Sequence, residues 1–202
     1  TNFRRAAYES PGYSEAADAA WAAIALLRNS LDRPTTVSAF QPELKDVSNE
    51  ANRFSGRFEG DSRIPGLMAD LAARWLAAGD HQLALDYGSR VLTAPTASPA
   101  ERYAAWQVMA RIRQEEGDYG LAERAWGQAL NLAESERLAN VTEEQVSAIR
   151  KQLATSVYRQ AELAVSSGRL GEAVGHFRRV DSVLPGSDVA IRARYDAANT
   201  LL

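Results

Sequence analysis

Apolar residues recur at the three- and four-residue spacing of one helix face along nearly the whole chain. The positions between them are rich in alanine, arginine, glutamate and glutamine, which lose little conformational freedom in a helix. Strand-like alternation of apolar and polar residues is scarce. The pattern predicts an all-α chain whose helices run for about 12 to 25 residues and pair in antiparallel fashion across short turns.

Turn residues separate the predicted helices, and two residues carry a helix-start signal. Ser98 precedes Pro99 and Glu101, and Thr142 precedes Gln145 in the same relation, so each hydroxyl residue is expected to cap a helix in a capping box. The predicted breaks, each marked by glycine, proline or aspartate, lie at 10–13, 32–36, 59–66, 78–80, 94–99, 116–118, 166–169 and 184–188.

Three segments share one arrangement of small and bulky residues: GDHQLALDYGSRVL at 79–92, GDYGLAERAWGQAL at 117–130 and GRLGEAVGHFRRVD at 168–181. Each begins with a glycine, which is expected to end a helix in the left-handed conformation. An alanine follows five residues later, a bulky residue stands four residues beyond it in two of the copies, and a small apolar residue completes the buried stripe. The positions are Gly79, Gly117 and Gly168; Ala84, Ala122 and Ala173; Gly88, Trp126 and Phe177; and Val91, Ala129 and Val180.

This repeat resembles the tetratricopeptide repeat, a helix-turn-helix unit of about 34 residues. Ahead of the glycines, Trp106 with Ala110 and Val157 with Ala161 stand at the spacing that the family uses in its first helix. The earlier unit offers Met68 and Ala72 there, and Pro185 stands where the family often has proline. The register departs from the family, because Gly79, Gly117 and Gly168 stand 38 and 51 residues apart. Extra helical turns or loops must absorb the difference.

The resemblance implies a right-handed α-solenoid of about four to five stacked helix pairs, with partial units at both ends. It predicts one such array over residues 1–202, as a fragment of a longer chain. Its expected parts are the end of a preceding helix at 1–9, an irregular repeat at 13–58, repeats at 62–93, 99–137 and 143–183, and the first helix of a further unit at 187–202.

Proteins of this family bind peptides or helices on the solenoid surface, so the resemblance implies a protein or peptide partner. The lysines and asparagines with which some relatives grip a C-terminal carboxylate are absent from the matching positions, and that clamp is not predicted. In the family register, the candidate partner-binding groove consists of Gln107, Arg111, Gln114, Glu115, Tyr158, Glu162, Arg192 and Asn199.

Composition narrows the class of partner. The net charge of −3 and the pI near 5.5 argue against a nucleic-acid surface, which would need a strongly basic face. The absence of cysteine excludes disulfides and thiol chemistry. The apolar run at 16–27 is interrupted by Asp18 and is shorter than the roughly 20 residues that span a bilayer, so we expect no transmembrane segment in the chain. A membrane anchor outside the fragment stays open.

The sequence offers no catalytic, cofactor-binding or metal-binding motif, and we expect no enzyme. His81 and His176 lack neighbouring ligand residues, and each is expected to lie on the surface. The four tryptophans are interpreted as packing residues, with Trp75 as the one considered for a binding role because its register places it near a helix edge.

Two segments, FRRAAYESPGYSEAADAAW and RFSGRFEGDSRIP, resemble repeat junctions of periplasmic outer-membrane assembly lipoproteins and cell-division coordinators of Gram-negative bacteria. This similarity favours a scaffold of a bacterial cell-envelope assembly or secretion complex in the periplasm, with the cytoplasm as the alternative. A second hypothesis is a ligand- or peptide-sensing regulatory domain attached to an output domain elsewhere in the chain. A third, an α/α toroid enzyme, would require more helices than this chain offers.

Overall fold

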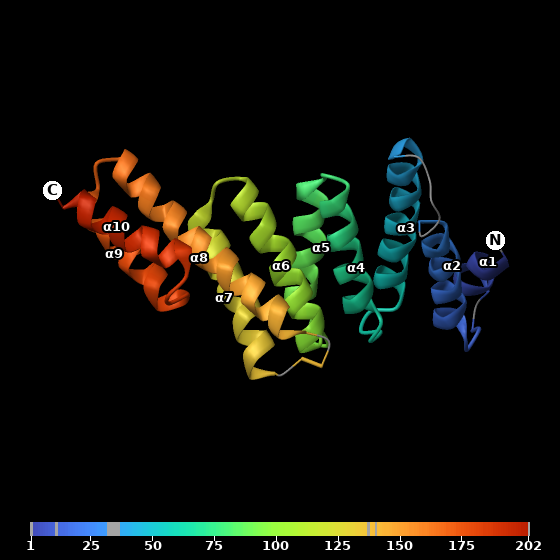
Figure 1. The fold of residues 1–202 in the computed structure, drawn as a ribbon. Helices are drawn as coiled ribbons and strands as arrows, with labels where there is room; N and C mark the ends of the chain where they lie inside the picture. Colours follow the sequence, from blue (N-terminus) through green and yellow to red (C-terminus); the bar gives the residue numbers. More distant parts are fainter. Residues whose placement is uncertain (1, 11, 32–36, 137, 140, 202) are drawn as a thin grey trace. The chain divides into compact units, whose positions relative to one another are not determined.

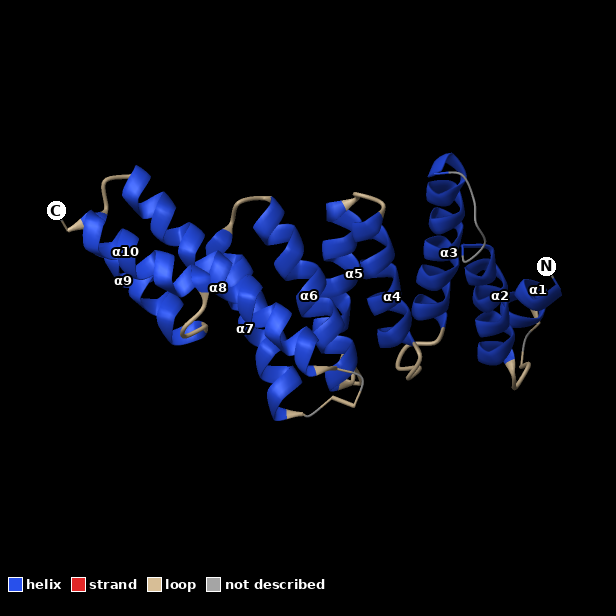
Figure 2. Ribbon diagram, in the orientation of Figure 1, coloured by secondary structure: helices blue, strands red, loops and turns tan. Residues whose placement is uncertain are grey.

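The computed structural model describes residues 2–10, 12–31, 37–136, 138–139 and 141–201. Every regular element in these residues is an α-helix, which confirms the predicted all-α class (Figure 2). The predicted turn at 32–36 and the predicted boundaries at 1, 137 and 202 lie outside the described residues. The chain divides into two compact units, Thr1–Ala97 and Ser98–Leu202.

The first unit contains α1 (Asn2–Glu9), α2 (Ala16–Leu31), α3 (Val37–Arg57), α4 (Ile64–Ala77) and α5 (His81–Thr93), and successive helices pack against one another in chain order (Figure 1). Trp75 is 1% exposed in the core of this unit, so it is a packing residue. Its indole Nε1 donates a hydrogen bond of 2.9 Å to Oγ of the buried Ser48 on α3. A second bond, from Asn52 Nδ2 to the hydroxyl of Tyr87 at 3.2 Å, ties α3 to α5.

The second unit contains α6 (Pro99–Glu115), α7 (Tyr119–Ser135), α8 (Glu143–Ser166), α9 (Leu170–Val183) and α10 (Asp188–Thr200). Its helices also pack in chain order, and α10 contacts α8 as well as α9. In both units this order of packing is compatible with a helical solenoid.

Both predicted capping boxes are present at the helix starts of the second unit. The Ser98 side chain accepts from the Glu101 amide at 3.3 Å while the Glu101 carboxylate accepts from the Ser98 amide at 2.7 Å. Thr142 and Gln145 form the same pair of bonds at the start of α8. These contacts satisfy amide groups that the first helical turn leaves without partners.

The predicted left-handed glycines are confirmed, with φ of 79° at Gly79, 79° at Gly117 and 70° at Gly168. At the second of them, the amide of Asp118 donates back to the carbonyl of Arg113 at 2.8 Å, which closes the end of α6. The Asp118 carboxylate then accepts from the amide of Leu121 at 3.1 Å and caps α7. Gly117 thus ends α6, and Asp118 starts α7.

The small and bulky positions of the repeat are buried as predicted. Ala84, Ala122 and Ala173 are fully buried, and the bulky side chains of Trp126 and Phe177 are buried as well. The first copy has Gly88 at the bulky position, and there the neighbouring Tyr87 is the large buried side chain of α5.

Candidate functional site

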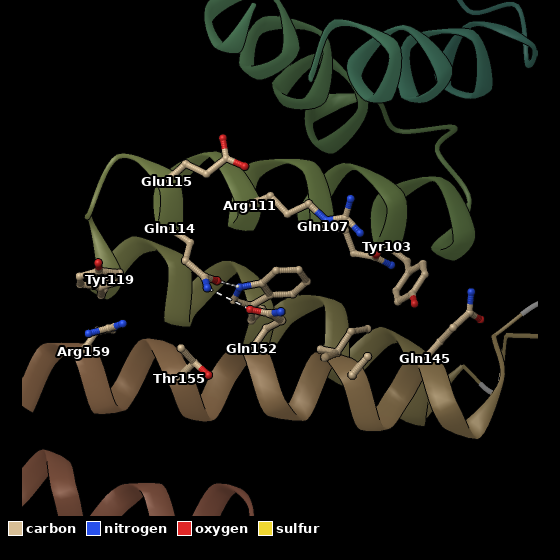
Figure 3. Close-up of a pocket in the computed structure, with 13 residues that line it drawn as sticks. Tyr103, Gln107, Arg111, Gln114, Glu115, Tyr119, Gln145, Gln152, Thr155 and Arg159 are labelled. Carbon is tan, nitrogen blue, oxygen red and sulfur yellow. Dashed lines mark hydrogen bonds between the residues drawn. The ribbon is translucent and has the colours of Figure 1, made fainter. Parts of the chain in front are cut away.

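A groove of about 650 Å³ runs between α6 and α8 of the second unit. It follows both helices lengthwise, with Tyr103 and Gln145 at one end and Glu115 and Arg159 at the other (Figure 3). Its lining residues are Tyr103, Gln107, Arg111, Gln114 and Glu115 from α6, Tyr119 and Trp126 from α7, and Gln145, Ala148, Ile149, Gln152, Thr155 and Arg159 from α8.

The groove is built from matching faces of two helices. Its lining residues recur every three or four positions on each helix, because such positions share one helix face. Gln107 and Gln114 stand on α6, and Gln145 and Gln152 stand 38 positions later on α8. The four amides reach into the space between the helices in two facing rows (Figure 3).

A chain of hydrogen bonds fixes the orientation of two of these amides. The Trp126 indole Nε1 donates to Gln114 Oε1 at 2.9 Å, and Gln114 Nε2 donates to Gln152 Oε1 at 2.9 Å. An indole N–H is a donor with no acceptor function, so it requires the oxygen of Gln114 on its side. That requirement places the nitrogen of Gln114 toward Gln152, and the oxygen of Gln152 toward Gln114.

The charged residues that line the groove, Arg159, Glu115 and Arg111, differ in whether they form ion pairs and in which direction they point. Arg159 Nη1 donates to Glu162 Oε2 at 2.6 Å, and this hydrogen bond raises the pKa of the guanidinium. The carboxylate of Glu115 turns away from α8 at the groove's edge (Figure 3). Arg111 takes part in none of the ion pairs among the described residues, which leaves its charge facing the groove without a counterion.

The positive charge of Arg111 affects the pKa of Tyr103. Burial raises the pKa of its hydroxyl, while a hydrogen bond from Gln107 and the charge of Arg111 oppose that rise. The phenol, the amide and the guanidinium therefore lie within one another's influence at this end of the groove.

The eight residues that the family register assigned to a partner-binding groove separate in the structure. Gln107, Arg111, Gln114 and Glu115 line the groove. The other four do not line it. Tyr158 on α8 is 7% exposed and packs against α9 and α10, and Glu162 forms an ion pair with Arg159. Arg192 and Asn199 are exposed on α10.

The register explains this separation. Aligning the glycines shifts α6 onto α8 by 51 positions and pairs Gln107 with Tyr158, whereas the groove pairs residues that are 38 positions apart. The longer α8 has 24 residues against 17 in α6, and its lining residues run from Gln145 to Arg159. The repeated spacing of the glutamines was the signal that could have identified Gln145 and Gln152 from the sequence.

Tyr158 joins α8 to α10. Its hydroxyl donates to Asp196, its ring meets Phe177 edge-on with 5.3 Å between ring centroids, and the Arg192 guanidinium lies 5.6 Å from its ring centre. Burial, followed by the hydrogen bond to Asp196, raises the pKa of this hydroxyl to about 12.

We expect Tyr158 to make the protein lose stability in alkali. Between pH 10.0, the ordinary pKa, and about 12, the unfolded chain has released this proton while the native state retains it. The unfolded state binds fewer protons in that range, so the free energy of unfolding falls as the pH rises. Urea unfolding of Tyr158→Phe between pH 9 and 12 should show a shallower decline than the wild type, with the exposed Tyr195→Phe as the control. Parallel curves for wild type and Tyr158→Phe would contradict this assignment.

No protein-family model matches the chain, and no curated protein matches it. The resemblance to tetratricopeptide repeats therefore rests on the repeated residues themselves. Among the described residues, no three histidine, cysteine, aspartate or glutamate side chains come together as a metal site would require. In the same part of the chain, every helix is too short or too polar to cross a membrane.

Proposed function

We propose that this protein is a protein-interaction module that binds an extended segment of a partner in the groove between α6 and α8. The observation that carries the proposal is the two facing rows of glutamine amides, Gln107 with Gln114 and Gln145 with Gln152. A peptide backbone presents an N–H donor and a C=O acceptor at almost every residue. The side-chain oxygens of Gln114, Gln145 and Gln152 already accept hydrogen bonds within the protein, so the remaining N–H groups of these rows suit the C=O groups of a partner's main chain.

The length of the groove agrees with this type of ligand. From Gln145 to Arg159 the α8 lining extends over about 21 Å at about 1.5 Å per residue. An extended chain rises about 3.3 Å per residue, so the groove accommodates about six residues of a partner. Tyr103 at one end and Tyr119 toward the other add aromatic surface for its side chains.

The proposal includes the architecture and the setting that the sequence suggests. Right-handed stacking of tetratricopeptide type is supported by the glycine, alanine and bulky positions shared by the three repeated segments. A role in a bacterial cell-envelope complex is supported by the two junction segments in the first unit. In this proposal the groove selects partners by their sequence, and the module catalyses no reaction.

A tryptophan placed in the groove should block the partner. Ala148 is exposed and lines the groove, so Ala148→Trp is expected to fill it and weaken partner binding by more than about tenfold with little change in melting temperature. Ser147→Trp is the matched control, because Ser147 is the exposed neighbour outside the lining. Fluorescence anisotropy of a labelled partner segment measures the difference, and equal affinities for the two variants would refute groove binding.

The partner segment can be obtained from native cells by photo-crosslinking. A photoreactive amino acid at position 148 of the full-length protein is expected to capture a partner that position 147 does not. Envelope assembly components among the captured proteins would support the proposed setting. Capture of cytosolic regulators alone would favour a sensing domain instead.

A further inference from the structure

The hydrogen-bond chain in the groove fixes the direction of the Gln152 amide nitrogen. Trp126 fixes the oxygen of Gln114, Gln114 fixes the oxygen of Gln152, and the nitrogen of Gln152 is then directed away from Gln114. Its two N–H groups are exposed donors, so a ligand that displaces solvent here is stabilised by bringing an acceptor to this point of the groove.

Arg111 lies on the α6 side of the groove, and its side chain extends along α6 toward Gln107 and Tyr103 (Figure 3). In the 38-residue register its position faces Ile149, which is three residues, about 4.5 Å along the axis, from Gln152. Its charge has no carboxylate partner among the ion pairs of the described residues, and Glu115 points away from this space (Figure 3). The part of the groove between Tyr103 and Gln152 therefore combines a cation that has no ion-pair partner among the described residues with a pair of oriented amide donors.

We infer that the groove selects a partner segment with an internal aspartate or glutamate, whose carboxylate binds between the Arg111 guanidinium and the Gln152 amide nitrogen. This inference rests on the proposed function and adds the chemistry of the preferred ligand. A carboxylate accepts several hydrogen bonds at once, and its bonds to a guanidinium are stronger than those between neutral groups. One cation and one neutral amide match the single charge of a carboxylate better than the nearly double charge of a phosphate.

The test is a selection from a displayed library of random heptapeptides held between flanking linkers, so that no free terminus takes part. The library is selected against the wild-type protein, Arg111→Gln, Gln152→Glu and Arg178→Gln. Arg178 is exposed on α9 outside the groove, so its variant removes the same charge elsewhere. Melting temperatures of all four proteins verify folding.

Wild-type protein and Arg178→Gln are expected to enrich peptides with aspartate or glutamate at one position. For an enriched peptide, replacing that acid by its amide should weaken binding to wild type by about tenfold and to Arg111→Gln by less than about twofold. Gln152→Glu should lose the acidic peptides as well, because it places a negative charge at the same point.

Two other outcomes are distinguishable. Enriched peptides that compete at the groove, and that Ala148→Trp rejects, but that show no preference for an acid would overturn this inference and leave the proposed function standing. If Ala148→Trp and the wild type retain the same peptides, or no peptide is enriched, both the inference and the proposed function fail.

Discussion

Trp75→Ala is expected to lower the free energy of unfolding by about 3 to 5 kcal/mol, the largest effect of any single change considered for this protein. The indole of Trp75, on α4, is 1% exposed in the core of the first unit. Its removal leaves a large cavity, and it also deprives the buried Ser48 hydroxyl of the donor 2.9 Å away. Urea denaturation followed by far-ultraviolet circular dichroism measures the loss.

Trp75→Phe separates the two contributions. The phenyl ring retains most of the packing and lacks the N–H, so we expect a smaller loss of about 1 to 3 kcal/mol. A Trp75→Ala protein that unfolds at the wild-type urea concentration would show that the indole contributes little to the core. The same result would reopen the interpretation of Trp75 as a binding residue.

Gly117→Val should destabilise the second unit by about 2 kcal/mol. Gly117 has φ of 79°, a conformation that costs an L residue about 1 to 2 kcal/mol, and a β-branched side chain adds to that cost. No heavy atom lies within 4 Å of a Cβ added there, so the effect is expected to come from the backbone rather than from a clash. The urea midpoint and the melting temperature both report it.

Gly127→Ala is the control with the opposite expected sign. Gly127 lies inside α7, and an added Cβ there also meets no atom within 4 Å. Alanine in a helix interior is favoured over glycine by about 0.5 to 1 kcal/mol, so this variant should be slightly more stable than the wild type. If both glycine variants shifted stability in the same direction, the left-handed turn would not be the cause.

The turns and caps could be predicted from the sequence because their causes are local. A glycine that must be left-handed and a serine paired with Glu101 each act within a few residues. The repeated alanines predicted the buried stripe for a similar reason, since their spacing defines one helix face.

The binding groove was only half predictable because it depends on how far each helix extends. Four candidate residues on α6 line it, but their partners on α8 follow from where that helix begins, at Glu143, and from a register of 38 rather than 51. Because of the same difference in register, Tyr158 does not line the groove and lies in the core beside Phe177. A glycine marks where a pair of helices turns, and it does not specify how many helical turns precede it.

Trp126 connects the interior of the second unit to the groove, since its ring is buried and its Nε1 bonds to Gln114. Indole emission depends on the polarity and hydrogen bonding around the ring, and a ligand that moves the Gln114 amide changes both. The protein thus carries an intrinsic fluorophore one hydrogen bond away from its candidate site, and a bound ligand is expected to change the contribution of Trp126 to the emission.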